Sequence, residues 1–464
     1  MLSMHRPHSS THWAPQFSSA PSFLCASAFL IMAGLGFGIV QQAQAKLVLS
    51  TEVEKQNEAK KKLGVAATKS QDKAASASVY PHAMEPIGTV RQIYDGVLSP
   101  ELAVATFRNI DRLFPVNKIR AAQPNQVLPL VPASAQQVQS LAKLNWNERG
   151  VGLNLDRFYE ANRIAAVLVL KDGKVVLEQY RYGNSPKTRW MSMSVAKSIT
   201  STLVGAAIKQ AKIKSVNDKV ISYVPELKNS GYRDASIRDV LMMASGVAWS
   251  ETYADPRSDR RRLLEAQIGQ KPGAVLEVLR QLPRVAEPGT VANYNTGETQ
   301  IAAYVLRNAV GSSLSDYLSE RIWRRLGMEA DAYWWLDAPN GVEIGGSGIA
   351  ATLRDYGRFA LFMLAQGKIK DEKILPDGWT YEATTPRLLK NGRPLAYGYL
   401  WWPATSAEAQ RDAAYAAIGI HGQAMYINPR TQTAVVLWGA QPQPTGGAAT
   451  DYWAFFNAVN AALR

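Results

Sequence analysis

Runs of β-forming residues stand at both ends of the main part of this chain, and a mostly helical stretch separates them. The first two runs, residues 164–170 and 175–183, flank Asp172-Gly173, a dipeptide typical of a tight β-hairpin turn. Further strand-like runs follow in the last quarter, at residues 397–403, 418–427 and 433–440. We expect the strands from both ends to close into one body, with the helical stretch inserted between them.

The middle of the chain, about residues 200–358, has the sequence marks of helices. Ser236 and Asp239 have the spacing of a capping box, as do Thr352 and Asp355, so these carboxylates are read as helix caps and not as catalytic groups. The expected fold class is therefore α/β (α+β), an antiparallel sheet flanked by helices plus an inserted, mostly helical domain.

The first 45 residues have the features of a secretory signal peptide. Arg6 is their only charged residue, an apolar run extends over 23–40, and Ala43-Gln44-Ala45 has the small-x-small form of a cleavage site. We expect export to the periplasm with cleavage near Ala45/Lys46. The alternative is an uncleaved anchor; in either case this segment is the only membrane contact expected.

Two further segments precede the main body, which is expected at 156–464. Residues 46–80 are rich in Lys, Glu, Ala, Ser and Gln and read as a polar tether. Residues 81–155 carry apolar clusters interrupted by proline, and we expect them to form an N-terminal extension that packs on the main body.

Composition excludes several kinds of site. The single cysteine, Cys25, lies in the signal segment, so neither a thiol nucleophile nor a zinc-thiolate site is expected in the mature protein. Of five histidines only His82 and His421 lie outside that segment, which disfavours a histidine metal site; we expect no metal and no cofactor. The formal charge of +14 comes without a nucleic-acid-binding motif, so we expect a basic envelope protein and no nucleic acid partner.

A Ser-x-x-Lys pattern occurs three times, and its surroundings separate the three. The pairs are Ser70/Lys73 in the tether, Ser140/Lys143 in a short polar helix, and Ser194/Lys197 where the chain passes from a strand into a buried helix. At a helix N-terminus, unpaired N–H groups can stabilise a developing oxyanion. A lysine one turn later lies on the same helix face, and its neutral amine can take the serine proton. The alternative is that the serine only caps the helix and the lysine is solvated.

Two later elements extend this constellation. Tyr294 stands in a loop after Pro288-Gly289-Thr290, where its phenol can shuttle a proton to a leaving group while the lysine lowers its pKa. Residues 419–423, Gly-Ile-His-Gly-Gln, lie inside a strand pattern, and glycine there often marks close approach to a ligand.

In this order, the three elements resemble those of the serine β-lactamase and penicillin-binding-protein superfamily, over about residues 156–464. The phrases LMMASGVAWSETY, LSERIWRRLGMEADAYWWLD, GGSGIAATLRDYGRFALFML and GIHGQ are similar to the branch of 6-aminohexanoate-dimer (nylon-oligomer) hydrolases. The resemblance implies that Ser194 is the acylated nucleophile, Lys197 its activator and Tyr294 the general base and acid. It also implies a β-lactamase-like fold.

The resemblance further implies a substrate-binding set. The oxyanion hole would combine the N–H of Ser194 with one N–H from the strand, and the candidate residues there are Ile420, His421, Gly422 and Gln423. Tyr253 matches a loop tyrosine that contacts substrate in the nylon-oligomer branch, with a core or rim aromatic as the alternative. His421 either contacts substrate or is a structural strand residue.

Two departures from the class C pattern weaken a β-lactamase assignment. The Tyr-x-Asn of that class reads Tyr294-Asn295-Thr296, which moves the amide to Asn295 and makes Asn295 the candidate substrate-binding amide. Its Lys-Thr-Gly reads Ile420-His421-Gly422, which lacks a charged anchor. We therefore expect a serine hydrolase that cleaves an ester or amide of a small molecule through an acyl-enzyme. The alternatives are penicillin-binding or β-lactamase activity, a D-amino-acid peptidase, or a non-catalytic cell-envelope binding protein of the same fold.

Overall fold

The computed structural model describes residues 80–464. The expected signal peptide, with Cys25, lies outside the described residues, as does the expected tether except for Tyr80. Within residues 80–464, no helix is both long and apolar enough to cross a membrane.

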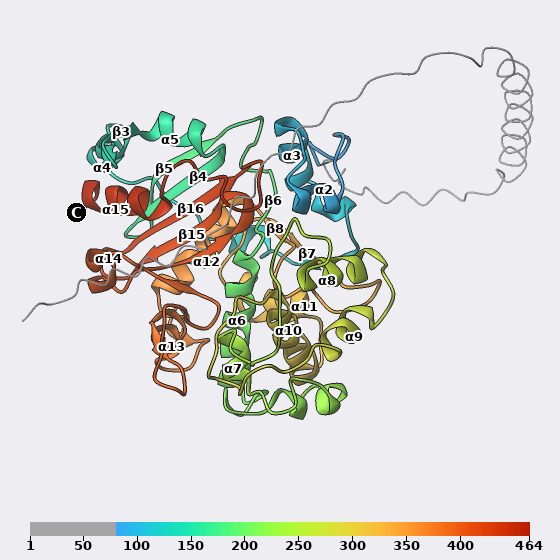
Figure 1. The fold of residues 1–464 in the computed structure, drawn as a ribbon. Coiled ribbons are helices and arrows are strands. Elements are labelled where there is room, and N and C mark those ends of the chain that lie inside the picture. Colours follow the sequence, from blue (N-terminus) through green and yellow to red (C-terminus); the bar gives the residue numbers. More distant parts are fainter. Residues whose placement is uncertain (1–79) are drawn as a thin grey trace, which may run out of the picture. The chain divides into compact units, whose positions relative to one another are not determined.

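A six-stranded antiparallel sheet joins strands from both ends of the main body (Figure 1). In spatial order its strands are β13 (Trp402–Pro403), β14 (Tyr415–Gly419), β15 (Gln423–Asn428), β16 (Thr433–Gly439), β4 (Ile164–Lys171) and β5 (Lys174–Tyr180). The pairing of β16 with β4 runs from Thr433 opposite Lys171 to Gly439 opposite Ile164. The expectation that strands from both ends of the main body join in one sheet is therefore confirmed.

The hairpin between β4 and β5 turns at the expected dipeptide. Lys171 pairs with Lys174, and the two residues between them, Asp172 and Gly173, have φ angles of 50° and 75°. Two positive φ angles match the right-handed twist of the flanking strands, which explains the Asp-Gly sequence.

Helices cover both faces of this sheet, and β4 is buried along most of its length for that reason. Val167 and Val169 pack into a core cluster with α5 (Leu155–Ala161) and α15 (Tyr452–Ala462). Leu168 and Leu170 point the opposite way, into a cluster with α6 (Val195–Lys209) and α12 (Leu353–Leu364). The expected sheet flanked by helices is confirmed.

A smaller four-stranded antiparallel sheet supports the start of α6. Its order is β1 (Val116–Ile119), β7 (Ala332–Trp335), β8 (Ile349–Ala351) and β6 (Trp190–Met191). Directly after β6, the Ser192 N–H donates to the Ile349 carbonyl at 2.8 Å. The segment that leads into α6 is thus fixed to β8 by its backbone.

Most of the remaining helices come between α6 and α12 in the sequence. They are α7 (Ile237–Leu241), α8 (Asp259–Ile268), α9 (Ala274–Arg280), α10 (Thr296–Val310) and α11 (Leu314–Leu318). Short elements complete the fold: α4 (Ala135–Ala142), α13 (Trp379–Thr384), α14 (Ala407–Arg411), β2 (Asn145–Glu148), β3 (Val151–Asn154), β9 (Lys368–Ile369), β10 (Glu372–Lys373), β11 (Arg387–Leu388) and β12 (Pro394–Leu395).

The two expected capping boxes have different outcomes. Ser236 and Asp239 form the full reciprocal box at the start of α7. Thr352 caps α12, but the Asp355 carboxylate accepts from the N–H groups of Glu329 and Ala330 instead of returning a bond to the cap. Asp355 therefore joins the loop before β7 to α12.

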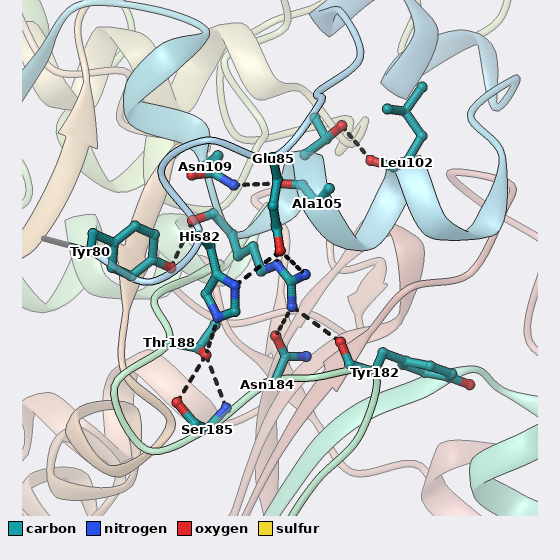
Figure 2. Close-up of polar contacts among 12 residues, drawn as sticks. Tyr80, His82, Glu85, Leu102, Ala105, Asn109, Tyr182, Asn184, Ser185 and Thr188 are labelled. Atoms are coloured by element: carbon teal, nitrogen blue, oxygen red, sulfur yellow. Dashed lines mark hydrogen bonds and ion pairs between the residues drawn. The ribbon is translucent and has the colours of Figure 1, made fainter.

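Residues 80–114 form a segment that we name the N-terminal strap. It contains α2 (Val90–Asp95) and α3 (Pro100–Phe107), and its apolar residues, among them Ile93 and Phe107, belong to the same core cluster as α6. Close to its beginning, His82 lies within hydrogen-bond distance of Thr188 in the loop that precedes β6, and Glu85 pairs with Arg108 of the same strap (Figure 2).

Two strand expectations need correction. Only Trp402–Pro403 of residues 397–403 is a strand, because Leu400 has a φ of 61° and breaks the extended path. Residues 418–427 are two strands joined by a tight turn, with His421 and Gly422 at φ angles of 61° and 86° and Gly419 opposite Gln423. The His-Gly pair thus serves as a hairpin turn, a use that the strand pattern concealed.

The stacked pair Phe158 and Phe455 provides a stability test of this packing. Their rings are 4.1 Å apart in a cluster that joins α5 and α15 to the sheet, and Phe455 is fully buried. Phe455→Ala leaves a cavity and is expected to lower the free energy of unfolding by about 3–5 kcal/mol in urea denaturation. Tyr381→Ala, at a 71% exposed position, is the control and should change it by about 0.5 kcal/mol or less; equal effects would contradict the packing described.

Candidate active site

Ser194 occupies the N-cap position of α6, but its side chain makes no capping hydrogen bond. The hydroxyl is therefore not committed to the helix, against the alternative that this serine is only a cap. Met193 directly before it has a φ of 47°, a strained conformation for a non-glycine residue. Such strain is typical of a residue held in place by its surroundings at a functional site.

Lys197 lies one helical turn later and points at the same hydroxyl. Its Nζ donates to Ser194 Oγ and to the carbonyl of Gly346, each at 3.0 Å, and the residue is only 2% exposed. Burial lowers the pKa of Lys197 to about 7, Glu251 acts in the opposite direction, and Arg260 lowers it further. A large fraction of this amine is thus neutral near pH 7 and can accept a proton.

Tyr294 lies close to this amine. Lys197 Nζ is 5.3 Å from the centroid of the Tyr294 ring, which stacks against Trp402 at 5.8 Å. Burial raises the pKa of Tyr294, Glu251 raises it as well, and a hydrogen bond with Ser194 acts in the opposite direction. The expected net lowering of the Tyr294 pKa is therefore wrong, because burial and the Glu251 carboxylate outweigh the groups that lower it. The phenol is held as a proton donor.

The β14–β15 turn brings backbone to the start of α6. A Cβ at Gly419 would lie 2.8 Å from the Ser192 carbonyl oxygen and 3.0 Å from the Ser194 nitrogen, so only glycine allows this approach. Ile420 follows at once and is half-buried. The N–H of His421 donates to the Pro444 carbonyl at 3.1 Å and is not free for a ligand.

The side chains of this turn serve the fold. His421 is 2% exposed, its Nδ1 lies 2.8 Å from the Gln441 carbonyl, and its ring packs on Phe107 at 5.1 Å. Burial lowers the pKa of His421 to about 4. The Gln423 amide bonds to both backbone groups of Gly439, and Gly422 lies against Tyr452. None of these contacts of His421, Gly422 and Gln423 involves Ser194.

Asn295 and Tyr253 also have clear positions. Asn295 is fully buried and caps α10 by accepting from the Glu298 N–H, so its amide is committed to the helix. Tyr253 is half-buried and close enough to Tyr294 and Glu251 for both to raise its pKa, after the larger effect of burial. Tyr253 therefore lies near Tyr294 and Glu251, whereas the Asn295 amide is used within α10.

Glu251 and Arg260 belong to the site and were missed by sequence reasoning. The Glu251 carboxylate accepts from the Thr296 hydroxyl at 2.5 Å and from the Thr296 N–H at 3.0 Å, next to Tyr294. Arg260 Nε lies 3.9 Å from the Glu251 carboxylate, and the side chains of Arg260 and Glu251 are 5% and 14% exposed. The only sequence mark was the position of Glu251 inside the phrase SGVAWSETY.

The other serine–lysine pair that the structure describes has no such surroundings. Ser140 donates back to the Gln136 carbonyl within α4, and both Ser140 and Lys143 are exposed. Among residues 80–464 there is also no group of three or more His, Cys, Asp or Glu side chains arranged to hold a metal ion.

A family model described as Beta-lactamase matches residues 156–459, the span that holds Ser194, Lys197 and Tyr294. The 6-aminohexanoate-dimer hydrolase of Paenarthrobacter ureafaciens is 29% identical over 314 residues, 65% of this chain and 77% of the relative. The D-aminopeptidase of Brucella anthropi is 29% identical over 178 residues, 35% of this chain and 31% of the relative. A solved Bacillus anthracis structure, assigned as a 6-aminohexanoate-dimer hydrolase, shares the fold with a TM-score of 0.68 at 22% identity, covering 79% of this chain and 94% of that one.

The pKa of Lys197 makes the site's pH dependence testable. Since only the neutral amine accepts a proton, the rate at which a fluorophosphonate labels Ser194 should rise with pH through about 7 and then level off. Lys197→Arg keeps a cation of similar reach that does not deprotonate, and it should label at least about 10²-fold more slowly. A rate that is flat between about pH 5 and pH 9 would contradict this role.

Proposed function

Because the chain belongs to the beta-lactamase family of serine hydrolases, we propose that it hydrolyses an ester or amide bond through an acyl-enzyme on Ser194. The observation that carries this proposal is the 3.0 Å contact between Ser194 Oγ and the buried amine of Lys197, whose pKa burial lowers to about 7. A hydroxyl becomes a nucleophile when an adjacent base takes its proton, and burial is what makes a lysine such a base near pH 7.

In the first half of the reaction, Lys197 takes the Ser194 proton while Oγ bonds to the carbonyl carbon. The carbonyl oxygen becomes an oxyanion, which we assign to the N–H groups of Ser194 and Ile420. Gly419 lies against the Ser194 nitrogen, and the next N–H, that of His421, is already bonded to Pro444. Tyr294 gives its proton to the leaving amine or alkoxide and regains one from Lys197, so the two groups together carry the proton across.

The second half reverses these transfers with water. A water molecule loses a proton to the Tyr294 and Lys197 pair and attacks the acyl carbon. The bond from Oγ to that carbon then breaks, and Oγ recovers the proton. The products are a carboxylic acid and the free enzyme, and the protein's groups end in their starting state.

For the substrate we propose a small linear amide or ester. The site wall is aromatic, with Tyr397 and Trp402 4.6 Å apart beside Tyr294. Where class C enzymes have Lys-Thr-Gly, this chain has Ile420-His421-Gly422, and the histidine is buried against Phe107. A β-lactam carboxylate would therefore meet no cation from this turn. From the signal-peptide features of residues 1–45 we further propose that the protein acts in the periplasm.

Ser194→Ala tests the nucleophile. The variant should lose turnover of a p-nitrophenyl ester and of 6-aminohexanoate dimer by about 10⁴-fold or more, since no other group can form the acyl-enzyme. Ser140→Ala, in the exposed serine–lysine pair of α4, is the matched control and should keep full activity. Retained turnover in the Ser194 variant would refute the proposal.

Gly419→Ala tests the oxyanion hole. Its methyl group would lie 3.0 Å from the Ser194 nitrogen and 2.8 Å from the Ser192 oxygen, so we expect kcat to fall about 10²-fold. Gly152→Ala, which meets nothing within 4 Å, is the control and should leave kcat unchanged. A Gly419 variant with normal kcat would place the oxyanion elsewhere.

A further inference from the structure

The N-terminal strap lies outside residues 156–459, the span of the family match, yet it contacts the site in two places. One is the loop that leads into β6 and Ser194. The other is the segment that carries Glu251 and Tyr253. These two contacts are made by different parts of the strap and have different chemistry.

The first contact fixes both ends of the strap to the main body, through Tyr80 and His82 near its beginning and Arg108 near its end (Figure 2). His82 Nε2 lies 3.1 Å from the Thr188 hydroxyl, and Arg108 donates to Asn184 Oδ1 at 3.1 Å while it is paired with Glu85. Arg189, the next residue before β6, has its guanidinium 4.0 Å from the centroid of the Tyr80 ring. The strap is thus anchored where the chain enters the nucleophile's segment.

The second contact reaches Tyr253 through the end of α2. The Tyr94 and Tyr253 rings lie 6.0 Å apart. Asp95 pairs with Arg261 at 2.5 Å, and the same Arg261 Nη1 donates to the Tyr253 carbonyl at 3.1 Å. Two adjacent strap residues therefore hold Tyr253, one through its ring and one through its backbone.

Tyr94 also reaches the acidic group of the site. Its hydroxyl accepts a hydrogen bond from Arg260, whose guanidinium lies 4.3 Å from the centroid of the Tyr94 ring. Arg260 in turn faces Glu251, the carboxylate that binds Thr296 beside Tyr294. The path from the strap to the catalytic tyrosine is a chain of buried or half-buried contacts.

We propose that Tyr94 and Asp95 of the strap are positioning residues that set the substrate-side wall formed by Tyr253 and Glu251. The inference rests on the proposed acyl-transfer function. Its consequence is that Asp95 acts on substrate binding and not on the reactivity of Ser194. The contacts of Asp95 run through Arg261 to the Tyr253 backbone, whereas the Ser194 hydroxyl is held by Lys197 and Lys197 by Gly346.

A simple tether is the competing explanation, and the chain contains a control for it. Arg91 of α2 pairs with Glu265 of α8 at 2.5 Å, joining the same two helices as Asp95 and Arg261. That pair is solvent-exposed, with 53% and 43% of the side chains accessible. Within residues 80–464 the side chains of Arg91 and Glu265 are hydrogen-bonded to each other and not to Tyr253 or Glu251. Glu265→Gln and Asp95→Asn therefore remove the same charge from the same pair of helices. Only Asp95→Asn changes the partner of Arg261, the residue that binds the Tyr253 carbonyl.

Asp95→Asn should raise KM for a p-nitrophenyl ester about fivefold, with kcat and the fluorophosphonate labelling rate of Ser194 within about twofold of the unaltered protein. Glu265→Gln should change none of these. In a Tyr253→Ala background, Asp95→Asn should have no further effect on KM, because the residue through which it acts is gone. Asp95→Glu, which keeps the charge, should restore most of the affinity.

The inference is overturned if Asp95→Asn leaves KM unchanged, if Glu265→Gln raises KM equally, or if the Asp95 effect persists without Tyr253. If Asp95→Asn does not fold, Tyr94→Phe replaces it, since it keeps the ring and removes only the acceptor for Arg260. That variant should raise KM about twofold to threefold, and an unchanged KM would overturn the inference. Absence of Ser194 labelling in the unaltered protein would instead refute the proposed function.

Discussion

The burial of one amine, that of Lys197, is the constraint on which the site depends. An ammonium group removed from water loses its hydration, so the proton binds less tightly and the neutral form becomes available. The free-energy cost of burying the amine is partly offset, because the amine still has two oxygen partners, Ser194 and Gly346. A Cβ at Gly346 would lie 2.9 Å from Thr296 Cγ2 and 3.1 Å from Nζ, so a larger residue would crowd this contact.

Two charged groups near this amine act on its pKa in opposite directions. Glu251 favours the protonated form of Lys197, and Arg260 opposes it. Both groups also lie close enough to Tyr253 and Tyr294 to shift the pKa values of these tyrosines. Glu251 also helps to keep Tyr294 protonated. Lys197, which can lose its proton near pH 7, and the protonated Tyr294 lie next to the same serine, so they form an acceptor and a donor for the two ends of a proton transfer. The remaining residues of the site hold these two groups in their places.

Local spacing was enough to predict part of this arrangement. Ser194 and Lys197 meet because residues three apart share a helix face, and Asp172-Gly173 turns because two positive φ angles suit that dipeptide. The family resemblance supplied Tyr294, which no spacing rule would place beside a helix about a hundred residues earlier. The family and the β-lactamase-like fold are confirmed by the comparisons.

Other features depend on contacts that sequence spacing does not reveal. Asn295 was read as a substrate-side amide, but it caps α10, since the cap position is decided by where the helix begins. The turn at His421 was hidden by apolar residues on both sides of it. Glu251 and Tyr94 gain their roles from partners in other elements, so no local pattern marked them.

The central claim, that Ser194 is acylated with Lys197 as its base, is tested most directly by trapping the intermediate. The protein is mixed with a p-nitrophenyl ester, quenched with acid, digested and analysed by mass spectrometry, in parallel with Lys197→Met. The account predicts an acyl group on the peptide that contains Ser194, and little or none in the methionine variant. An acyl group on another residue, or equal acylation in both proteins, would contradict it.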